Sequence, residues 1–122
     1  MTKKTKVLYV DDEVINLELF RINFRKIYHI LTAIAPSEAL KILDEHPETD
    51  VVISDMKMPE LNGIEFIKRA KNKYPEIKYY ILTGFEITPA ITEALHTNLI
   101  LKYFKKPYQM QEIEEAINSA MI

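Results

Sequence analysis

The sequence predicts an α/β fold in which a parallel sheet is covered by helices on both faces. Short apolar stretches alternate five times with longer segments of helical period along the 122 residues, which is typical of repeated strand and helix pairs. Several strand candidates are almost continuously apolar, as strands buried on both faces tend to be. The expected strands span residues 6–10, 28–33, 50–54, 78–82 and 101–104.

Five helices are expected to follow these strands, because apolar residues recur there at intervals of three and four. The first and last should bury the stripes Leu17, Phe20, Phe24, Ile27 and Met110, Ile113, Ile117, Ala120. The second, at 36–46, should bury Ala39, Leu40 and Leu43, and the third, at 64–74, Ile67, Ala70 and Tyr74.

Proline and asparagine mark several helix ends. Pro47 and Pro75 lie just beyond the second and third helices and should stop them. The fourth helix, at 89–97, begins with Pro89 at a favourable first position. Asn98 follows it and is expected to take the left-handed conformation that usually falls to glycine.

Composition argues against several functions. With 16 Lys and Arg against 18 Asp and Glu, the chain lacks the basic excess that direct binding to nucleic acid requires. Cysteine is absent, which rules out disulfides and thiolate metal sites. We expect no membrane span and no secretion signal, because the apolar runs are only a few residues long. A single cytoplasmic domain over residues 1–122 is the expectation.

Polar side chains follow four of the five expected strands. They are Asp11 and Asp12 after the first, Asp55 after the third, Thr83 and Gly84 after the fourth, and Lys105 and Lys106 after the fifth. Open parallel sheets bind ligands beyond the carboxyl ends of their strands, so these groups are expected to meet at one edge. The only two glycines, Gly63 and Gly84, lie in loops beside the acids, which suggests that these loops have demanding backbone shapes.

The three acids predict a divalent cation. If the first and third strands are neighbours about 4.8 Å apart, Asp11, Asp12 and Asp55 cannot all be charged and close together without a counter-cation. Mg²⁺ fits, because it prefers oxygen ligands and is often held by one or two carboxylates plus a phosphate. An acyl phosphate on Asp55 would need a lysine and a neutral donor such as Thr83. These residues therefore suit phosphoryl transfer.

This arrangement resembles the receiver domain of two-component response regulators, of the chemotaxis-regulator type, over nearly the whole chain. The resemblance rests on Asp11-Asp12, the block DMKMPELNG at 55–63, Thr83-Gly84 and Lys106-Pro107. Four such elements in order make a specific match. The resemblance implies a flavodoxin-like, doubly wound sheet of five parallel strands in the order 2-1-3-4-5, with five helices.

The resemblance also implies a reaction. Asp55 would be the phosphoacceptor, which attacks the phosphohistidine of a sensor histidine kinase or phosphotransfer protein. Asp12, Asp55 and the backbone carbonyl of Lys57 would bind Mg²⁺ directly, while Asp11 would act mostly through water. The chain would catalyse only its own phosphorylation and dephosphorylation and would not act as an enzyme on a metabolite.

A switch follows from the same resemblance. Lys106, rather than Lys105, would be the site lysine, because it precedes Pro107 across an expected cis peptide. Thr83 would bond the phosphoryl group and move toward it, which frees space for Tyr103 as the switch aromatic. The fourth helix, fifth strand and fifth helix would then control a downstream protein or output domain. By analogy, this face would also form a phosphorylation-dependent homodimer.

Two positions depart from the commonest receiver pattern. Lys57 and Phe85 lie two residues beyond Asp55 and Thr83, where a long cation and a bulky ring would hinder attacking water. We therefore hypothesise slow loss of phosphate. Asn98 replaces the more usual glycine before the fifth strand.

Each group also has a simpler interpretation by itself, since paired acids such as Asp11-Asp12 often only cap a helix.

Three other functions would also use this kind of fold and must be weighed against phosphoryl acceptance. An aspartate-nucleophile phosphatase would usually need a second acid where Lys57 stands. A phosphorylation-independent interaction module would tend to lack one of the acids or the lysine. A flavin-binding module would carry a Ser-, Thr- and Gly-rich loop after the first strand.

Overall fold

A computed structural model describes residues 4–84 and 86–122. Five strands alternate with five helices, which confirms the predicted fold class. The elements are β1 (Lys6–Val10), α1 (Val14–Phe24), β2 (His29–Ala33), α2 (Pro36–Glu45), β3 (Val51–Asp55), α3 (Gly63–Lys73), β4 (Lys78–Thr83), α4 (Pro89–His96), β5 (Lys102–Lys105) and α5 (Met110–Ala120). None of the helices in these ranges is long and apolar enough to cross a membrane.

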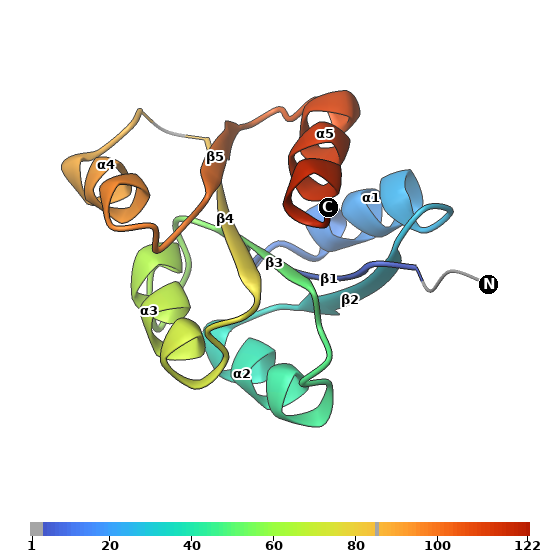
Figure 1. Ribbon diagram of the computed structural model, residues 1–122, viewed down its shortest axis with the longest axis horizontal. Helices are drawn as coiled ribbons and strands as arrows, with labels where there is room; N and C mark the ends of the chain where they lie inside the picture. Colours follow the sequence, from blue (N-terminus) through green and yellow to red (C-terminus); the bar gives the residue numbers. More distant parts are fainter. Residues whose placement is uncertain (1–3, 85) are drawn as a thin grey trace.

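The sheet is parallel throughout and has the order β2-β1-β3-β4-β5, as the resemblance implied. Helices α1 and α5 cover one face, and α2, α3 and α4 cover the other (Figure 1). The chain changes direction across the sheet between β1 and β3, which pair directly. In a doubly wound sheet this is the place where a crevice opens beyond the carboxyl ends of the strands.

Two apolar layers hold the fold together, because successive side chains of a strand point to opposite faces. The layer under α1 and α5 is rich in aromatic rings, and the Tyr9 and Phe20 rings stack with centroids 4.3 Å apart. The layer under α2, α3 and α4 is mostly aliphatic. Every residue of β3 is buried, so the strand that ends at Asp55 lies at the centre of the molecule.

The predicted helix ends are largely confirmed, since α2 and α3 end shortly before Pro47 and Pro75, and two side-chain caps that were not predicted add to them. Asn62 caps α3 by accepting a hydrogen bond from the Glu65 N–H at 2.9 Å. Thr88 caps α4, and Pro89 occupies the first turn. Asn98 has φ 61°, the expected left-handed conformation.

Some predictions of burial are wrong. Ile27 is 42% exposed, because α1 ends at Phe24 and Ile27 lies beyond its last turn. Met110 is exposed at the first position of α5. Tyr74 is only partly buried, because its hydroxyl turns outward to donate to the Asp44 carboxylate. Such polar tips draw amphipathic side chains toward solvent.

Candidate functional site

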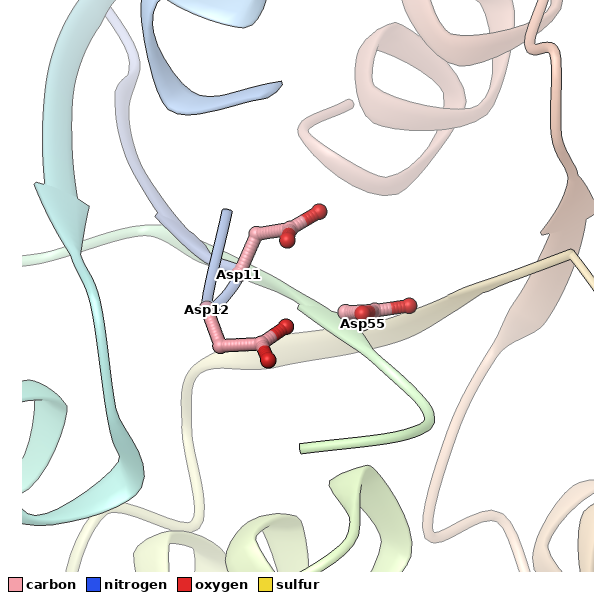
Figure 2. Close-up of side chains that lie close together, drawn as sticks. All are labelled: Asp11, Asp12 and Asp55. Atoms are coloured by element: carbon pink, nitrogen blue, oxygen red, sulfur yellow. The ribbon is translucent and has the colours of Figure 1, made fainter. Parts of the chain in front are cut away.

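Three carboxylates gather at the carboxyl ends of β1 and β3. Asp11 and Asp12 directly follow β1, and Asp55 is the last residue of β3. One oxygen from each lies within 4.8 Å of the other two. Figure 2 shows the three side chains projecting into one region from the two strand ends. The group offers oxygen atoms alone, which suits Mg²⁺ better than zinc.

Asp11 is fully buried and accepts four hydrogen bonds. Its Oδ2 accepts from the Tyr9 hydroxyl at 2.6 Å, the Lys106 ammonium at 3.1 Å and the Asn16 amide at 3.2 Å. Its Oδ1 accepts from the Glu13 backbone N–H at 2.9 Å. A carboxylate has about four acceptor sites, so Asp11 has little capacity left for direct coordination. Asp12, which is exposed, and Asp55, which is 8% exposed, are better placed for it.

Lys106 joins two of the acids. Its Nζ lies 3.1 Å from Asp11 Oδ2 and 3.2 Å from Asp55 Oδ1. The backbone N–H of Lys106 donates to the Thr83 carbonyl at 2.8 Å, which fixes the end of β5 against the end of β4. The peptide between Lys106 and Pro107 is cis, as the resemblance implied. Lys105, in contrast, is exposed to solvent.

Negative charge outweighs positive charge in this cluster. Burial raises the pKa of Asp55, the charge of Asp11 raises it further, and Lys106 only partly offsets both effects. Burial by itself would lower the pKa of Lys106, but the carboxylates of Asp55 and Asp11 outweigh it and raise that pKa. The ionised form of Asp55 is therefore disfavoured until further positive charge arrives.

This raised pKa predicts a pH-dependent cost to stability in metal-free protein. Folded protein keeps a proton on Asp55 that the unfolded chain releases near the ordinary aspartate pKa of 3.8, so stability falls as pH rises through the folded pKa. In chelator at pH 7, Asp55→Asn is expected to have a larger free energy of unfolding than the parent protein. The difference in free energy of unfolding between the two proteins should disappear below pH 3.8, where Asp55 is protonated in both states. Urea unfolding at several pH values measures it.

Asp44→Asn is the matched control and should behave in the opposite way. Lys73, whose Nζ lies 2.7 Å away, and then Tyr74 lower the pKa of the exposed Asp44 carboxyl. Its ionised form is thus favoured in the folded state above the unfolded pKa, and the substitution should slightly reduce stability at pH 7. An equal change of stability in the two variants would contradict the electrostatic cost assigned to ionised Asp55.

The remaining predicted residues lie at strand ends or along the site. Thr83 is the last residue of β4 and is 1% exposed. Tyr103 is half-buried on β5, paired in register with Ile81, and packs against the apolar layer on the α4 side. Lys57 lines an open hollow of about 630 Å³ together with Asp12, Asp55 and Lys106. Phe85 lies outside the described residues, so the hypothesis of slow phosphate loss stays a prediction.

The two glycines differ in what they allow. The Gly63 N–H donates to the Met56 carbonyl at 2.8 Å. A Cβ at Gly63 would lie 2.5 Å from the Asp55 carbonyl oxygen and 2.7 Å from Ile81 Cδ1. At Gly84 the nearest atoms are those of the Lys106 side chain, at 3.9 Å or more. Only Gly63 therefore meets the expectation of a demanding backbone shape, because neighbouring atoms leave no room there for a side chain. Gly84 has room for a Cβ.

Sequence reasoning missed several supporting residues. Tyr9 and Asn16 both donate to Asp11. Strand alternation gives a signal for Tyr9, because residues two apart in a strand share a face. Nothing in the sequence indicates that Glu60, with φ 74°, accepts hydrogen bonds at 3.1 Å from both the backbone N–H and the hydroxyl of Ser37.

Comparisons with known proteins agree with this geometry. Residues 7–118 match the family model of the response regulator receiver domain. The chain is 28% identical over 119 residues to the hydrogenase transcriptional regulatory protein HoxA of Cupriavidus necator, covering 98% of this chain and 24% of that protein. It is 32% identical over 113 residues to the sporulation initiation phosphotransferase F of Bacillus subtilis, covering 92% and 90%.

Solved structures give the same result. A response regulator receiver domain protein from Clostridium thermocellum superposes with a TM-score of 0.84 at 32% identity, covering 95% of this chain and 93% of that one. The chain thus spans about a quarter of the hydrogenase regulators that it matches and most of the shorter relatives.

Proposed function

Because the chain belongs to the response regulator receiver domain family, we propose that it is a phosphoacceptor switch in which Asp55 takes a phosphoryl group from a protein phosphohistidine in a Mg²⁺-dependent step. One observation carries the proposal. The Asp55 carboxylate lies at the end of the central strand, beside two further acids and 3.2 Å from the Lys106 ammonium. No single part of this arrangement is specific, but together the parts suit phosphoryl transfer.

In the proposed reaction, an oxygen of Asp55 attacks the phosphorus of the phosphohistidine. The bond between phosphorus and nitrogen breaks, the imidazole leaves with the electron pair, and an acyl phosphate remains on Asp55. Lys106 already lies beside the attacking carboxylate and would pair with the phosphoryl oxygens. Thr83 would donate its hydroxyl to them. Attack of water on the phosphorus would then break its bond to the Asp55 oxygen, release inorganic phosphate and restore the carboxylate.

The cation would be held by the carboxylates of Asp12 and Asp55 and the backbone carbonyl of Lys57. Asp11 would contribute through water, which fits its four existing hydrogen bonds. When bound, Mg²⁺ supplies positive charge that stabilises the phosphoryl oxygens in the transition state. The open hollow leaves room for the water molecules that Mg²⁺ usually retains.

A protein donor needs a surface beside Asp55. Helix α1 begins just after the acidic pair and exposes the apolar side chains of Val14, Ile15, Leu19 and Ile22. Exposed apolar side chains gathered on one element commonly mark protein contacts. We propose this surface as the docking site of the sensor histidine kinase or phosphotransfer protein.

The output is proposed to run through α4, β5 and α5. The acyl phosphate adds negative charge, and Thr83 and Lys106 would move toward its oxygens. The half-buried Tyr103 would then change its packing. A downstream protein, an output domain or a second phosphorylated copy of the chain would bind the altered face. HoxA is a transcriptional regulatory protein by name, and for the present chain control of an output domain is a proposal.

The experiment is incubation with acetyl phosphate and Mg²⁺, followed by intact mass measurement. We expect the mass to rise by one phosphoryl group. Hydroxylamine should remove this group, as it does from an acyl phosphate, and a chelator should prevent its addition. Borohydride reduction followed by peptide mapping should mark position 55. Repeated turnover of a free phosphomonoester would instead favour a phosphatase. No mass gain with donor and Mg²⁺ present would support a phosphorylation-independent interaction module.

A further inference from the structure

The Tyr9 hydroxyl makes the shortest of the four hydrogen bonds to Asp11, at 2.6 Å. Tyr9 is 1% exposed and lies two residues before Asp11, so strand alternation directs both side chains to the same side of the sheet. A hydroxyl bonded to a carboxylate at this distance makes a strong, charge-assisted hydrogen bond. The proposed reaction makes no use of this buried phenol, which does not line the open hollow beside Asp55.

We propose that Tyr9 is a positioning residue for the cation site: its hydroxyl fixes the orientation of the Asp11 carboxylate and thereby sets the affinity for Mg²⁺. The inference rests on the proposed metal-dependent function. It adds a residue that acts through Asp11 and touches neither the cation nor the phosphoryl group.

The ring of Tyr9 is itself held rigidly. It stacks on Phe20 of α1, with ring centroids 4.3 Å apart and planes 19° apart. Phe20 in turn packs on Phe24, with centroids 4.6 Å apart. Both phenylalanines are fully buried. The hydroxyl therefore has a fixed position relative to α1, and its hydrogen bond holds the Asp11 carboxylate in one orientation.

Oδ2 of Asp11 needs such an anchor because its two other donors are shared with neighbouring carboxylates, whereas Oδ1 is held by the Glu13 backbone N–H. Lys106 shares its ammonium between Asp11 and Asp55. Asn16 is bonded to Glu13 as well, at 3.4 Å. Without the phenol, the Glu13 N–H still holds Oδ1, but both remaining donors to Oδ2 are shared, so the carboxylate can turn about that one contact. Hydrogen bonds that orient the groups around a metal typically change its affinity about 10- to 100-fold when removed.

The test compares Tyr9→Phe with Tyr80→Phe. Tyr80 belongs to the same apolar layer, is also 1% exposed, and donates its hydroxyl to the Ala116 carbonyl at 3.2 Å. Each variant removes one buried hydroxyl and keeps the ring. Mg²⁺ affinity is measured by calorimetry on unphosphorylated protein, and metal-free stability is measured by urea unfolding.

We expect both variants to lose some metal-free stability, and only Tyr9→Phe to raise the Mg²⁺ dissociation constant, by about tenfold. Parent-like affinity in Tyr9→Phe would overturn the inference and leave the proposed function intact. Failure of the parent protein itself to bind Mg²⁺ would overturn the proposed function as well.

A second measurement needs no variant. The Tyr9 hydroxyl proton should give a downfield, slowly exchanging proton resonance in the parent protein, and this resonance should persist when Mg²⁺ saturates the site. Its loss on Mg²⁺ addition would overturn the inference, because Tyr9 would then release Asp11 when the cation binds.

Discussion

Asp55→Asn is expected to abolish phosphoryl incorporation from acetyl phosphate, while Asp44→Asn should retain the parent rate. The amide is neutral and a poor nucleophile, so the step that forms the new oxygen to phosphorus bond has no other group to perform it. Loss of a nucleophile commonly costs more than about a thousandfold in rate. Asp44 undergoes the same chemical change on the exposed side of α2, where it pairs with Lys73. Intact mass spectrometry over time measures both rates.

The stability data separate loss of chemistry from loss of fold. Asp55→Asn should be folded and, in chelator at neutral pH, more stable than the parent protein, since burial and Asp11 raise the pKa of Asp55. Continued mass gain in Asp55→Asn would mean that another residue accepts the phosphoryl group. Loss of the mass gain in Asp44→Asn would point to a general effect of charge.

Gly63→Ala is expected to destabilise the protein by about 1–3 kcal/mol, the usual cost of overpacking a tight site. The added Cβ would meet the Asp55 carbonyl oxygen at 2.5 Å and the Met56 Cα at 3.1 Å, and these backbone atoms cannot turn aside as a flexible side chain would. Relief of the contact must shift the end of β3, so Mg²⁺ affinity should fall as well. Urea unfolding and calorimetry measure the two effects.

Gly84→Ala is the matched control. Its added Cβ would make only ordinary contacts with the Lys106 side chain at 3.9 and 4.0 Å, and Gly84 does not have positive φ. Stability should be unchanged or raised by about 0.4–1 kcal/mol, because alanine restricts the unfolded chain. Equal destabilisation by both substitutions would show that close approach at Gly63 is not the cause.

Local signals predicted the elements of the fold better than their arrangement. Apolar runs and helical period located five strands and five helices, since both follow from burial on the two faces of a sheet. The strand order came from the resemblance, because periodicity carries no information on which strands pair. The third strand extends one residue further than predicted and ends at Asp55. Burial of Ile27 was predicted wrongly because the period of α1 continues in sequence after the helix has ended.

The candidate site was predictable in its list of residues but less so in its contacts. Strand ends predicted that Asp11, Asp12 and Asp55 would meet. The choice of Lys106 over Lys105 came from the resemblance, since both lysines follow the same apolar run. The bond from Tyr9 to Asp11 depends on how a ring packs against α1, and that packing is a tertiary property.

The contact between Glu60 and Ser37 ties the loop after β3 to a helix that contributes no side chain to the acidic cluster. Ala35, which precedes α2, offers no side-chain cap, so a carboxylate from a distant loop serves the first turn instead. Rearrangement of that loop would remove this carboxylate from the first turn of α2. Because α2 directly follows the parallel strand β2, its first turn lies at the same edge of the sheet as Asp55, and the Glu60 carboxylate links that turn to the loop after β3.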